Sequence, residues 1–364
     1  MAADLQAVAS GGHQLVRVLL GWDAFMPSAS SVNTRRLRDF ERFLTVAEAA
    51  SLRVVPVLFV QSIGDVVMLP PFAIDVANPR RGVRVVSEGV VQPGGPRDVY
   101  TDRAMIEAAL RWGETMTSSF AGHGAVAWWD LAHDPATALR PRRITHLASW
   151  IHTVAQPFRD AGERSGVVLG TGDVVTARGV RLDVAFEGVD VAGVEVDVSR
   201  AALRGGTAAQ RTAFLLQLAQ RLGGADALHS HLVCCERDDD EPQGCMSEGE
   251  AHRYGADVVE IAVDHGCAGM HAAQWTRPGA RMIETPPFDT RRDIARRGLV
   301  DEHGRATRFG ASWMQQVAND REVQRAAPWP SQLDVDAYYA NLPDSLHDLY
   351  AAWDEGDDNP AMLN

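Results

Sequence analysis

The chain has 364 residues, of which 46% are hydrophobic and 23% charged, and its net charge is −13. This length allows one large domain or two ordinary ones, with ample material for a buried core. The acidity disfavours binding to nucleic-acid phosphates and anionic membranes, and it favours neutral or cationic ligands. All 35 residues of the Lys and Arg class are arginines, a composition typical of a GC-rich bacterial genome.

No targeting or membrane segment stands out in the sequence. No apolar run approaches the length of a membrane helix, and the first residues lack the basic and apolar regions of a secretion signal. We therefore expect a cytoplasmic protein. The cysteines form neither a disulfide framework nor a zinc-binding spacing. We expect all four to be buried or free thiols, and we expect no metal and no cofactor: Cys234, Cys235, Cys245 and Cys267.

Apolar runs alternate with helical patterns along the whole chain. A strand at 15–20 precedes a helix over 37–47, which Asn33 or Ser31 caps. After a strand at 54–59, a loop from about Gln61 to Tyr100 is long enough to shape a binding site. A helix capped by Thr101 then runs to Phe120. The remaining strands are predicted at 125–131, 166–169, 192–198, 228–235 and 267–273, with helices at 208–222 and 248–265.

This regular alternation of strand and helix implies a parallel sheet. So many units favour a closed TIM-type (β/α) barrel over an open doubly wound sheet. No glycine-rich phosphate loop follows the first strand, which counts against a nucleotide-binding fold. We predict a catalytic-type barrel over residues 1–327 and a C-terminal helical extension, packed on the barrel, over 328–364.

Two carboxylates follow apolar runs, and they suggest the chemistry. Asp134 comes after the run that ends in Trp128–Leu131, and Glu236 directly follows Leu232–Cys235. The carboxyl ends of parallel strands form the active-site face of a (β/α) barrel. A pair of carboxylates there is the minimum equipment for acid/base and nucleophilic work on a glycosidic bond.

With these residues the chain resembles the retaining glycoside hydrolases of clan A, the cellulase and mannanase-like barrels of the family 5 type. The resemblance covers most of the chain. Trp129–Pro135 looks like the tip of that family's fourth strand, which usually reads Trp-(Asp/Glu)-x-x-Asn-Glu-Pro. The other matching segments are 16–27 (second strand), 233–236 (seventh strand), Gln274–Trp275 (eighth strand) and 297–305 with Trp313 (closing segment).

The resemblance implies that Glu236 is the nucleophile and Asp134 the acid/base. Several positions depart from the family pattern. Asp134 replaces a Glu, His133 replaces an Asn that contacts a sugar hydroxyl, and the residues after Glu236 are not Phe-Gly. The sixth strand lacks the usual His and Tyr. Seven strands are predicted where the family has eight. Either the barrel is incomplete and lacks its first strand, or the chain starts late, or another segment or chain closes the barrel.

Further residues are predicted to bind substrate. Arg17 would hold Glu236 ionised, although the alternative is that a salt bridge of Glu236 with Arg17 or Arg237 is purely structural. Glu195 and Asp197 share one strand face and would suit a cationic or amino-sugar ligand, unless that face is a solvated rim. His133 would share a proton with Asp134 or bond locally. Aromatic platforms for a sugar ring are predicted at Trp22, Trp129 and Trp275.

Two functions remain open at this point. The first is a glycosidase acting on a small glycoside or oligosaccharide. The second is a barrel that has lost hydrolysis and binds a glycan or partner protein, or transforms another small metabolite. Replacing Glu by Asp retracts the carboxyl group by ~1.5 Å, and misplacement of that size can cost ~100-fold in rate. It also widens the carboxyl gap towards the ~6.5–9.5 Å of inverting enzymes. A barrel with open edges would favour a dimer or a partner chain.

Overall fold

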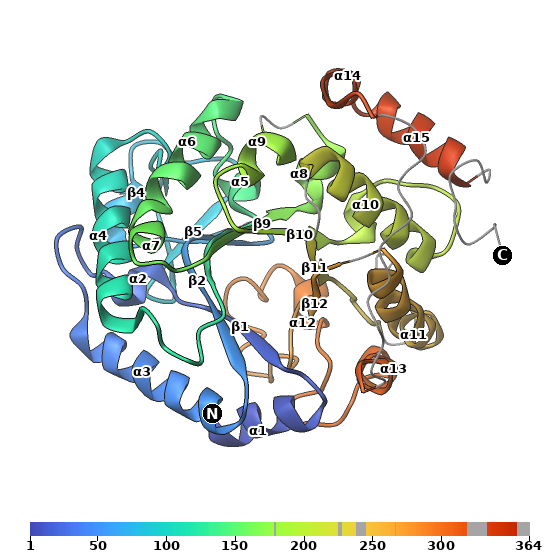
Figure 1. Cartoon of the computed structure of the whole chain (residues 1–364), viewed down its shortest axis with the longest axis horizontal. Coiled ribbons are helices and arrows are strands. Elements are labelled where there is room, and N and C mark those ends of the chain that lie inside the picture. The colour runs from blue at the N-terminus through green and yellow to red at the C-terminus, as the bar shows by residue number, and fades with distance from the viewer. Residues whose placement is uncertain (178–179, 225–227, 238–244, 266, 319–332, 355–364) are drawn as a thin grey trace. The chain divides into compact units, whose positions relative to one another are not determined.

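The computed structural model describes residues 1–177, 180–224, 228–237, 245–265, 267–318 and 333–354. The chain divides into two compact units. The first comprises 1–169, 184–191 and 284–290, and the second comprises 170–183, 192–283 and 291–364. Each unit combines parallel strands with helices (Figure 1).

Four parallel strands form the sheet of the first unit. They pair in the order β1, β2, β8, β9, with Arg17 opposite Val55 and Asp130 opposite both Val57 and Gly166. The bounds are β1 (Leu15–Leu19), β2 (Arg53–Ile63), β8 (Trp129–His133) and β9 (Ser165–Gly170).

The segment predicted as a long loop between Gln61 and Tyr100 contains short strands instead. β3 pairs with the end of β2 and with β5, β5 forms a hairpin with β6, and β4 pairs with β7. The prediction of a structureless loop was wrong because its apolar pairs, such as Val66-Val67 and Val85-Val86, are buried in this small sheet. The bounds are β3 (Val66–Met68), η1 (Pro71–Ala73), β4 (Ile74–Asp75), β5 (Arg84–Ser87), β6 (Val90–Gln92) and β7 (Gly95–Pro96).

The two longest helices of the first unit, α3 and α4, begin at side-chain caps and bury one apolar face. Asn33 accepts hydrogen bonds from the first backbone amides of α3, as predicted, because its oxygen satisfies donors that lack an intrahelical partner. α4 is capped by Asp102 rather than by Thr101. The bounds are α1 (Ala2–Ser10), α2 (Trp22–Phe25), α3 (Thr34–Ala49), α4 (Arg103–Phe120), α5 (Pro135–Ala138), α6 (Ile144–Val154) and α7 (Gln156–Asp160), followed by α9 (Leu182–Phe186), which spans the boundary of the units at Asp183.

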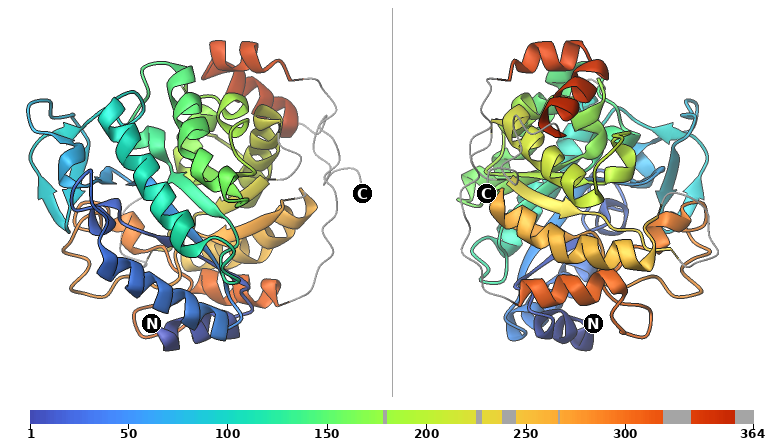
Figure 2. Two further views of the ribbon diagram at one scale, coloured as in Figure 1. Left: turned by 60° about the vertical axis from the view of Figure 1, so that its left-hand side comes forward. Right: turned by 90° about the vertical axis from the view of Figure 1, so that its right-hand side faces the viewer.

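The second unit has three parallel strands, paired in the order β10, β11, β12. They are β10 (Val191–Val196), β11 (Leu228–Leu232) and β12 (Gly269–Ala272). α10 (Ala208–Gly223) and α11 (Glu248–Asp264) each begin with a capping box, at Thr207 and Ser247. α11 packs along α13 (Arg308–Val317), as Figure 2 shows. The shorter elements are α8 (Thr171–Val175), η2 (Val198–Arg200) and α12 (Arg292–Ala295).

The last two described helices, α14 (Val335–Ala340) and α15 (Asp344–Asp354), pack on the second unit. The Tyr338 hydroxyl donates to the Val174 carbonyl at 2.8 Å, and Trp353 Nε1 donates to the Gln217 side chain at 2.9 Å. The predicted domain boundary between 327 and 328 lies outside the described residues, so the division into barrel and extension stays a prediction. No helix in the described part of the chain combines the length and the apolar character needed to cross a bilayer.

The expectation that all four cysteines are thiols was wrong. Cys235 and Cys245 form a disulfide with Cα atoms 4.8 Å apart, whereas Cys234 and Cys267 are buried free thiols. Burial raises the pKa of the Cys267 thiol to about 12, so this group stays protonated and inert at neutral pH. Sequence spacing did not reveal the bonded pair, because the chain folds back between residues that are ten positions apart.

His265 makes the stability of the fold depend on pH. Burial lowers its pKa to about 4, against about 6.5 in an unfolded chain. The unfolded state therefore binds more protons between these values, and stability falls as the pH drops from about 6.5 to about 4. We expect a total loss of about 3 kcal/mol from this residue. Urea denaturation across this range measures it, and His265→Gln removes that part of the slope.

The exposed His347→Gln variant is the matched control and keeps the native pH dependence. An unchanged slope in His265→Gln contradicts the assignment.

Candidate functional site

Arg17 lies at the centre of a buried polar cluster in the first unit. Its Nε donates to Asp130 Oδ2 at 2.5 Å, and its Nη1 lies 3.1 Å from His133 Nδ1. Trp128 Nε1 donates to the other oxygen of Asp130 at 2.8 Å. A buried charge must be paired, and the sequence offered Glu236 for this role. The structure instead gives the ion pair to Asp130, a residue that sequence analysis did not single out.

Asp134 directly follows β8 and is buried. Its backbone has φ 44° and ψ 51°, the left-handed conformation. Its N–H donates to the Val168 carbonyl at 2.9 Å, and its Oδ1 accepts from the Thr137 hydroxyl at 2.8 Å. A residue other than glycine costs of order 1 kcal/mol or more in this conformation, and such strain clusters at functional sites. The local backbone therefore fixes the carboxyl group at the carboxyl end of β8.

Glu236 is a buried carboxylate of the second unit, 7% exposed. Its Oε2 lies 3.1 Å from Nη2 of Arg277. The backbone amides of Arg308 and Phe309 each donate to it at 3.4 Å. These amides belong to the first turn of α13, where N–H groups lack intrahelical acceptors and the helix dipole favours an anion. The sequence had offered Arg17 or Arg237 as the cation, whereas the ion pair is with Arg277.

The backbone around Glu236 is tied down on both sides. Glu236 forms a parallel bridge with Met246. Met246 N–H donates to the Cys235 carbonyl, and Arg237 N–H donates to the Met246 carbonyl, both at 2.8 Å. The Cys235–Cys245 disulfide links the same two described segments covalently. Of the acidic run from Glu236 to Glu241 in the sequence, residues from 238 onwards lie outside the described part of the chain.

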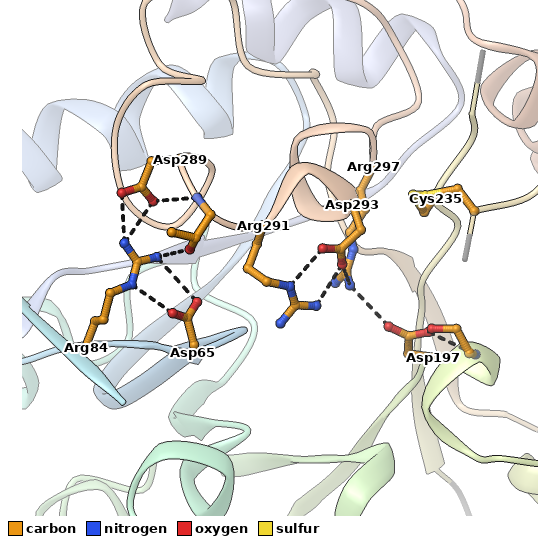
Figure 3. Close-up of polar contacts among 11 residues, drawn as sticks. Asp65, Arg84, Asp197, Cys235, Asp289, Arg291, Asp293 and Arg297 are labelled. Atoms are coloured by element: carbon orange, nitrogen blue, oxygen red, sulfur yellow. Dashed lines mark hydrogen bonds and ion pairs between the residues drawn. A yellow bond between two sulfur atoms is a disulfide. The ribbon is translucent and has the colours of Figure 1, made fainter. Parts of the chain in front are cut away.

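Glu195 and Asp197 are both buried, so the alternative of a solvated rim does not apply. Asp197 directly follows β10, its backbone is still extended (φ −113°, ψ 98°), and its side chain caps η2. Asp197 Oδ2 accepts from Arg297 Nη2 at 3.1 Å (Figure 3). Glu195 stays on the strand, and its Oε1 lies 3.8 Å from Arg200 Nη1.

The ion pair of Asp197 belongs to a larger network, drawn in Figure 3. Asp293 pairs with Arg291 at 2.8 Å and with Arg297 at 3.2 Å. Burial raises the pKa of Asp293, but hydrogen bonds and charge from Arg291 and Arg297 outweigh it and leave the pKa below its ordinary value. This network borders a cavity of about 770 Å³, together with the disulfide and with residues of α10 and α11. A cavity of that size is within the range of ligand sites.

In the first unit, a separate set of ion pairs secures the segment 284–290. Arg84 on β5 pairs with Asp65 and with Asp289, each at 2.8 Å (Figure 3). The hydrogen bonds that Arg84 donates to Asp289 and to Asp65 raise the pKa of its guanidinium.

Sequence analysis missed a row of histidines on the second unit. In the strand register, Glu195 lies opposite His231, and His231 lies opposite His271. The rings of His231 and His271 stack with centroids 4.3 Å apart and planes 3° apart. His271 Nε2 also lies 3.4 Å from Nδ1 of His229. His229 is on β11, two residues before His231, and therefore on the same face of that strand. A Cβ at Gly269 would lie 2.7 Å from the His229 ring, so glycine leaves room for it.

These residues make one face of the β10–β12 sheet polar near its carboxyl end. The opposite face carries Val194, Leu228 and Leu232, all fully buried. Parallel strands normally carry apolar side chains on both faces, so these Glu and His side chains mark a candidate binding or reacting surface. In the sequence, the alternation Leu228-His229-Ser230-His231 was the signal that one face of this strand carries histidines. Within the described residues, no group of three or more His, Cys, Asp or Glu is arranged to hold a metal ion.

The three tryptophans predicted as sugar platforms differ in exposure. Trp22 stacks on Trp112 with centroids 6.2 Å apart, and Trp129 donates from Nε1 to Glu163 at 3.1 Å. Both are buried in the core of the first unit, where a ligand ring does not reach them without a rearrangement. Trp275 follows β12 and is half-buried. Of the three tryptophans, Trp275 is therefore the candidate for contact with a sugar ring.

The fold is similar to those of solved glycoside hydrolases. A GH5_18 protein from Streptomyces cattleya, solved with GlcNAc, aligns at a TM-score of 0.73 and 15% identity, covering 90% of this chain and 76% of that one. A GH5_18 protein from Bifidobacterium longum subsp. longum, solved with Manβ1-4GlcNAc, gives 0.71 and 17%, covering 90% and 74%. The exo-β-1,4-mannosidase Op5Man5 from Opitutaceae bacterium strain TAV5 gives 0.70 and 17%, covering 87% of this chain.

This chain spans only 55% of the length of that mannosidase. Neither a family model nor a curated protein matches the sequence. The structural similarities confirm the resemblance at the level of the fold, which is that of the family 5 glycoside hydrolases of clan A.

The ion pair between Glu236 and Arg277 is predicted to couple their contributions to stability. Removing one partner of a mostly buried pair leaves an uncompensated charge, so Arg277→Met is expected to cost about 2–3 kcal/mol. Glu236→Gln in the same chain should recover about 1–2 kcal/mol of that loss. Urea denaturation of the single and double variants measures the coupling.

The exposed pair of Arg103 and Glu107 on α4 is the control, with an expected coupling of about 0.5 kcal/mol or less. If the two pairs show equal coupling free energies, Arg277 does not stabilise the buried charge of Glu236.

Proposed function

We propose that this chain, which has the family 5-like fold of clan A, hydrolyses a glycosidic bond of a small glycoside or oligosaccharide. Glu236 is the proposed nucleophile and Asp134 the proposed acid/base. The observation that carries the proposal is the setting of Glu236: a buried carboxylate beyond the carboxyl end of β11, compensated by Arg277 and the start of α13. A nucleophilic carboxylate must be ionised, and these contacts stabilise the charged form.

In the proposed reaction, protonated Asp134 gives its proton to the glycosidic oxygen as the bond to the anomeric carbon breaks. Glu236 attacks that carbon and forms a covalent glycosyl-enzyme. Asp134, now ionised, takes a proton from water, and the resulting hydroxide displaces Glu236 and releases the sugar. This sequence requires the two carboxyl groups roughly 5–5.5 Å apart, whereas a separation of ~6.5–9.5 Å would serve an inverting reaction.

The polar strand face of the second unit supplies the proposed sugar contacts. Glu195, His231 and His271 offer acceptors and donors for hydroxyl groups, and Trp275 offers an aromatic face. In the first unit, Arg17 and His133 are the proposed polar contacts, with Asp130 orienting Arg17. Because solved proteins of similar fold hold GlcNAc or Manβ1-4GlcNAc, β-mannosides are the substrates to test first.

We further propose that the parallel strands belong to one closed (β/α) barrel. The described residues supply seven strands for it: β1, β2 and β8–β12. A segment outside the described residues, or a second chain, would close the barrel. Strand edges that lack a partner tend to pair with further strands, which supports this proposal.

A specific observation favours a second candidate, a glycan-binding protein without hydrolysis. Both oxygens of Glu236 accept hydrogen bonds from α13, and one also contacts Arg277. Asp134 accepts from Thr137. Carboxylates engaged in this way contribute to structure, and the Asp at the acid/base position is shorter than the Glu of the family. In this candidate the polar strand face binds a sugar that is not cleaved.

Turnover on a panel of nitrophenyl glycosides separates the two candidates. If the chain is a glycosidase, Glu236→Gln is expected to lower kcat by about a thousandfold or more, because the nucleophile is lost. The control is Glu248→Gln, which changes an exposed carboxylate on α11 and should leave kcat within about twofold, as expected of a surface substitution.

Turnover that survives in Glu236→Gln rules out its role as nucleophile. Absence of turnover on every sugar, with ligand binding retained, leaves the second candidate.

A further inference from the structure

A second pocket, whose lining carries more arginines than carboxylates, lies in the second unit. Residues 277–283, the helix α12 and residues 301–305 enclose a cavity of about 430 Å³. Four arginines line it, against two carboxylates, although the chain as a whole is acidic. The four are Arg277, Arg292, Arg296 and Arg305.

The two carboxylates of the pocket already have partners. Asp301 accepts from the backbone amides of Arg305 and His303 and from Arg305 Nε at 2.7 Å. These bonds, led by the Arg305 amide, hold the pKa of Asp301 below its ordinary value. Glu302 accepts from the Ala280 amide at 3.2 Å. Asp301 is compensated by Arg305, and Arg277 pairs with Glu236. Arg292 and Arg296 then lie with one further carboxylate, Glu302, so the lining keeps a net positive charge.

Two of those arginines have donor capacity to spare. Arg292 is exposed on α12 and makes no ion pair with any residue that the structure describes. Arg277 is more buried, and its Nε and Nη2 atoms are shielded from solvent without a hydrogen-bond acceptor in the described chain. Its Nη2 contacts Glu236 as an ion pair but lacks the geometry of a hydrogen bond. A buried donor without an acceptor costs free energy. A ligand that brings an acceptor into the pocket would remove this cost.

We propose that this pocket binds a phosphate-class oxyanion, carried by a small metabolite of the size of a hexose phosphate. Arginine presents a planar fork of donors that matches the oxygens of phosphate. Several arginines around one cavity favour a dianionic ligand, such as a phosphate group, over a ligand with a single carboxylate charge. The volume exceeds what a bare phosphate fills and reaches the range of small-molecule sites. The proposal does not require hydrolysis, since none of its steps involves Asp134 or turnover.

Calorimetric titration of the whole protein at constant ionic strength tests the proposal. The three probes are a hexose 6-phosphate, inorganic phosphate and the uncharged hexose. We expect saturable binding of the hexose phosphate, and at least about tenfold weaker binding in the variant Arg292→Gln/Arg296→Gln, because charge-assisted contacts are lost. Arg277 is left unchanged because it also contacts Glu236.

Two controls keep the result interpretable. Arg103→Gln removes an exposed arginine of α4 and should leave the affinity unchanged. If the double variant does not fold, as judged by its thermal transition, Arg292→Gln alone replaces it, because Arg292 is exposed and its substitution leaves the core intact.

Inorganic phosphate binding as tightly as the hexose phosphate, and lost in the variant, supports the oxyanion site and identifies the free ion as the ligand. No saturable binding of either phosphate overturns the proposal. Binding that the double variant retains, or equal binding of the uncharged hexose, also overturns it. These binding measurements do not depend on glycosidase activity. Failure of the oxyanion proposal therefore leaves the proposed glycosidase function undecided, and the reverse also holds.

Discussion

The structure depends on the compensation of charges that are buried at the ends of parallel strands. Glu236 beyond β11 is held by Arg277 and by the first amides of α13, and Asp197 beyond β10 is held by Arg297. In the first unit, Asp130 on β8 is held by Arg17. Removing a charge from water is costly unless a partner offsets it. Each of these carboxylates therefore fixes the position of a guanidinium or a helix, and the loops at the strand ends are arranged around these pairs.

This constraint explains where sequence reasoning succeeded. Strand and helix positions follow from local periodicity, and a cap such as Asn33 needs only its own helix. The positions of Asp134 and Glu236 after their strands were predictable, because each follows an apolar run. The resemblance to family 5 enzymes, drawn from the order of such motifs, is confirmed for the fold by similarity to solved GH5_18 proteins.

The same constraint explains where sequence reasoning failed. The partner of a buried charge lies far away along the chain, as the separation of Arg17 from Asp130 by 113 residues shows. Nothing local indicates Arg277 as the partner of Glu236, or Cys245 as the partner of Cys235. The alternation Leu228-His229-Ser230-His231 signalled the face of β11, but the stacking of His231 on His271 required the register of β11 and β12.

The central claim is that Asp134 and Glu236 act on the same glycosidic bond. A crystal structure of the protein with a bound sugar measures the separation of their carboxyl groups directly. The account predicts about 5–5.5 Å, with the anomeric carbon between them. A separation well beyond ~9.5 Å, outside the ranges of both retaining and inverting enzymes, or a sugar bound elsewhere, would contradict it.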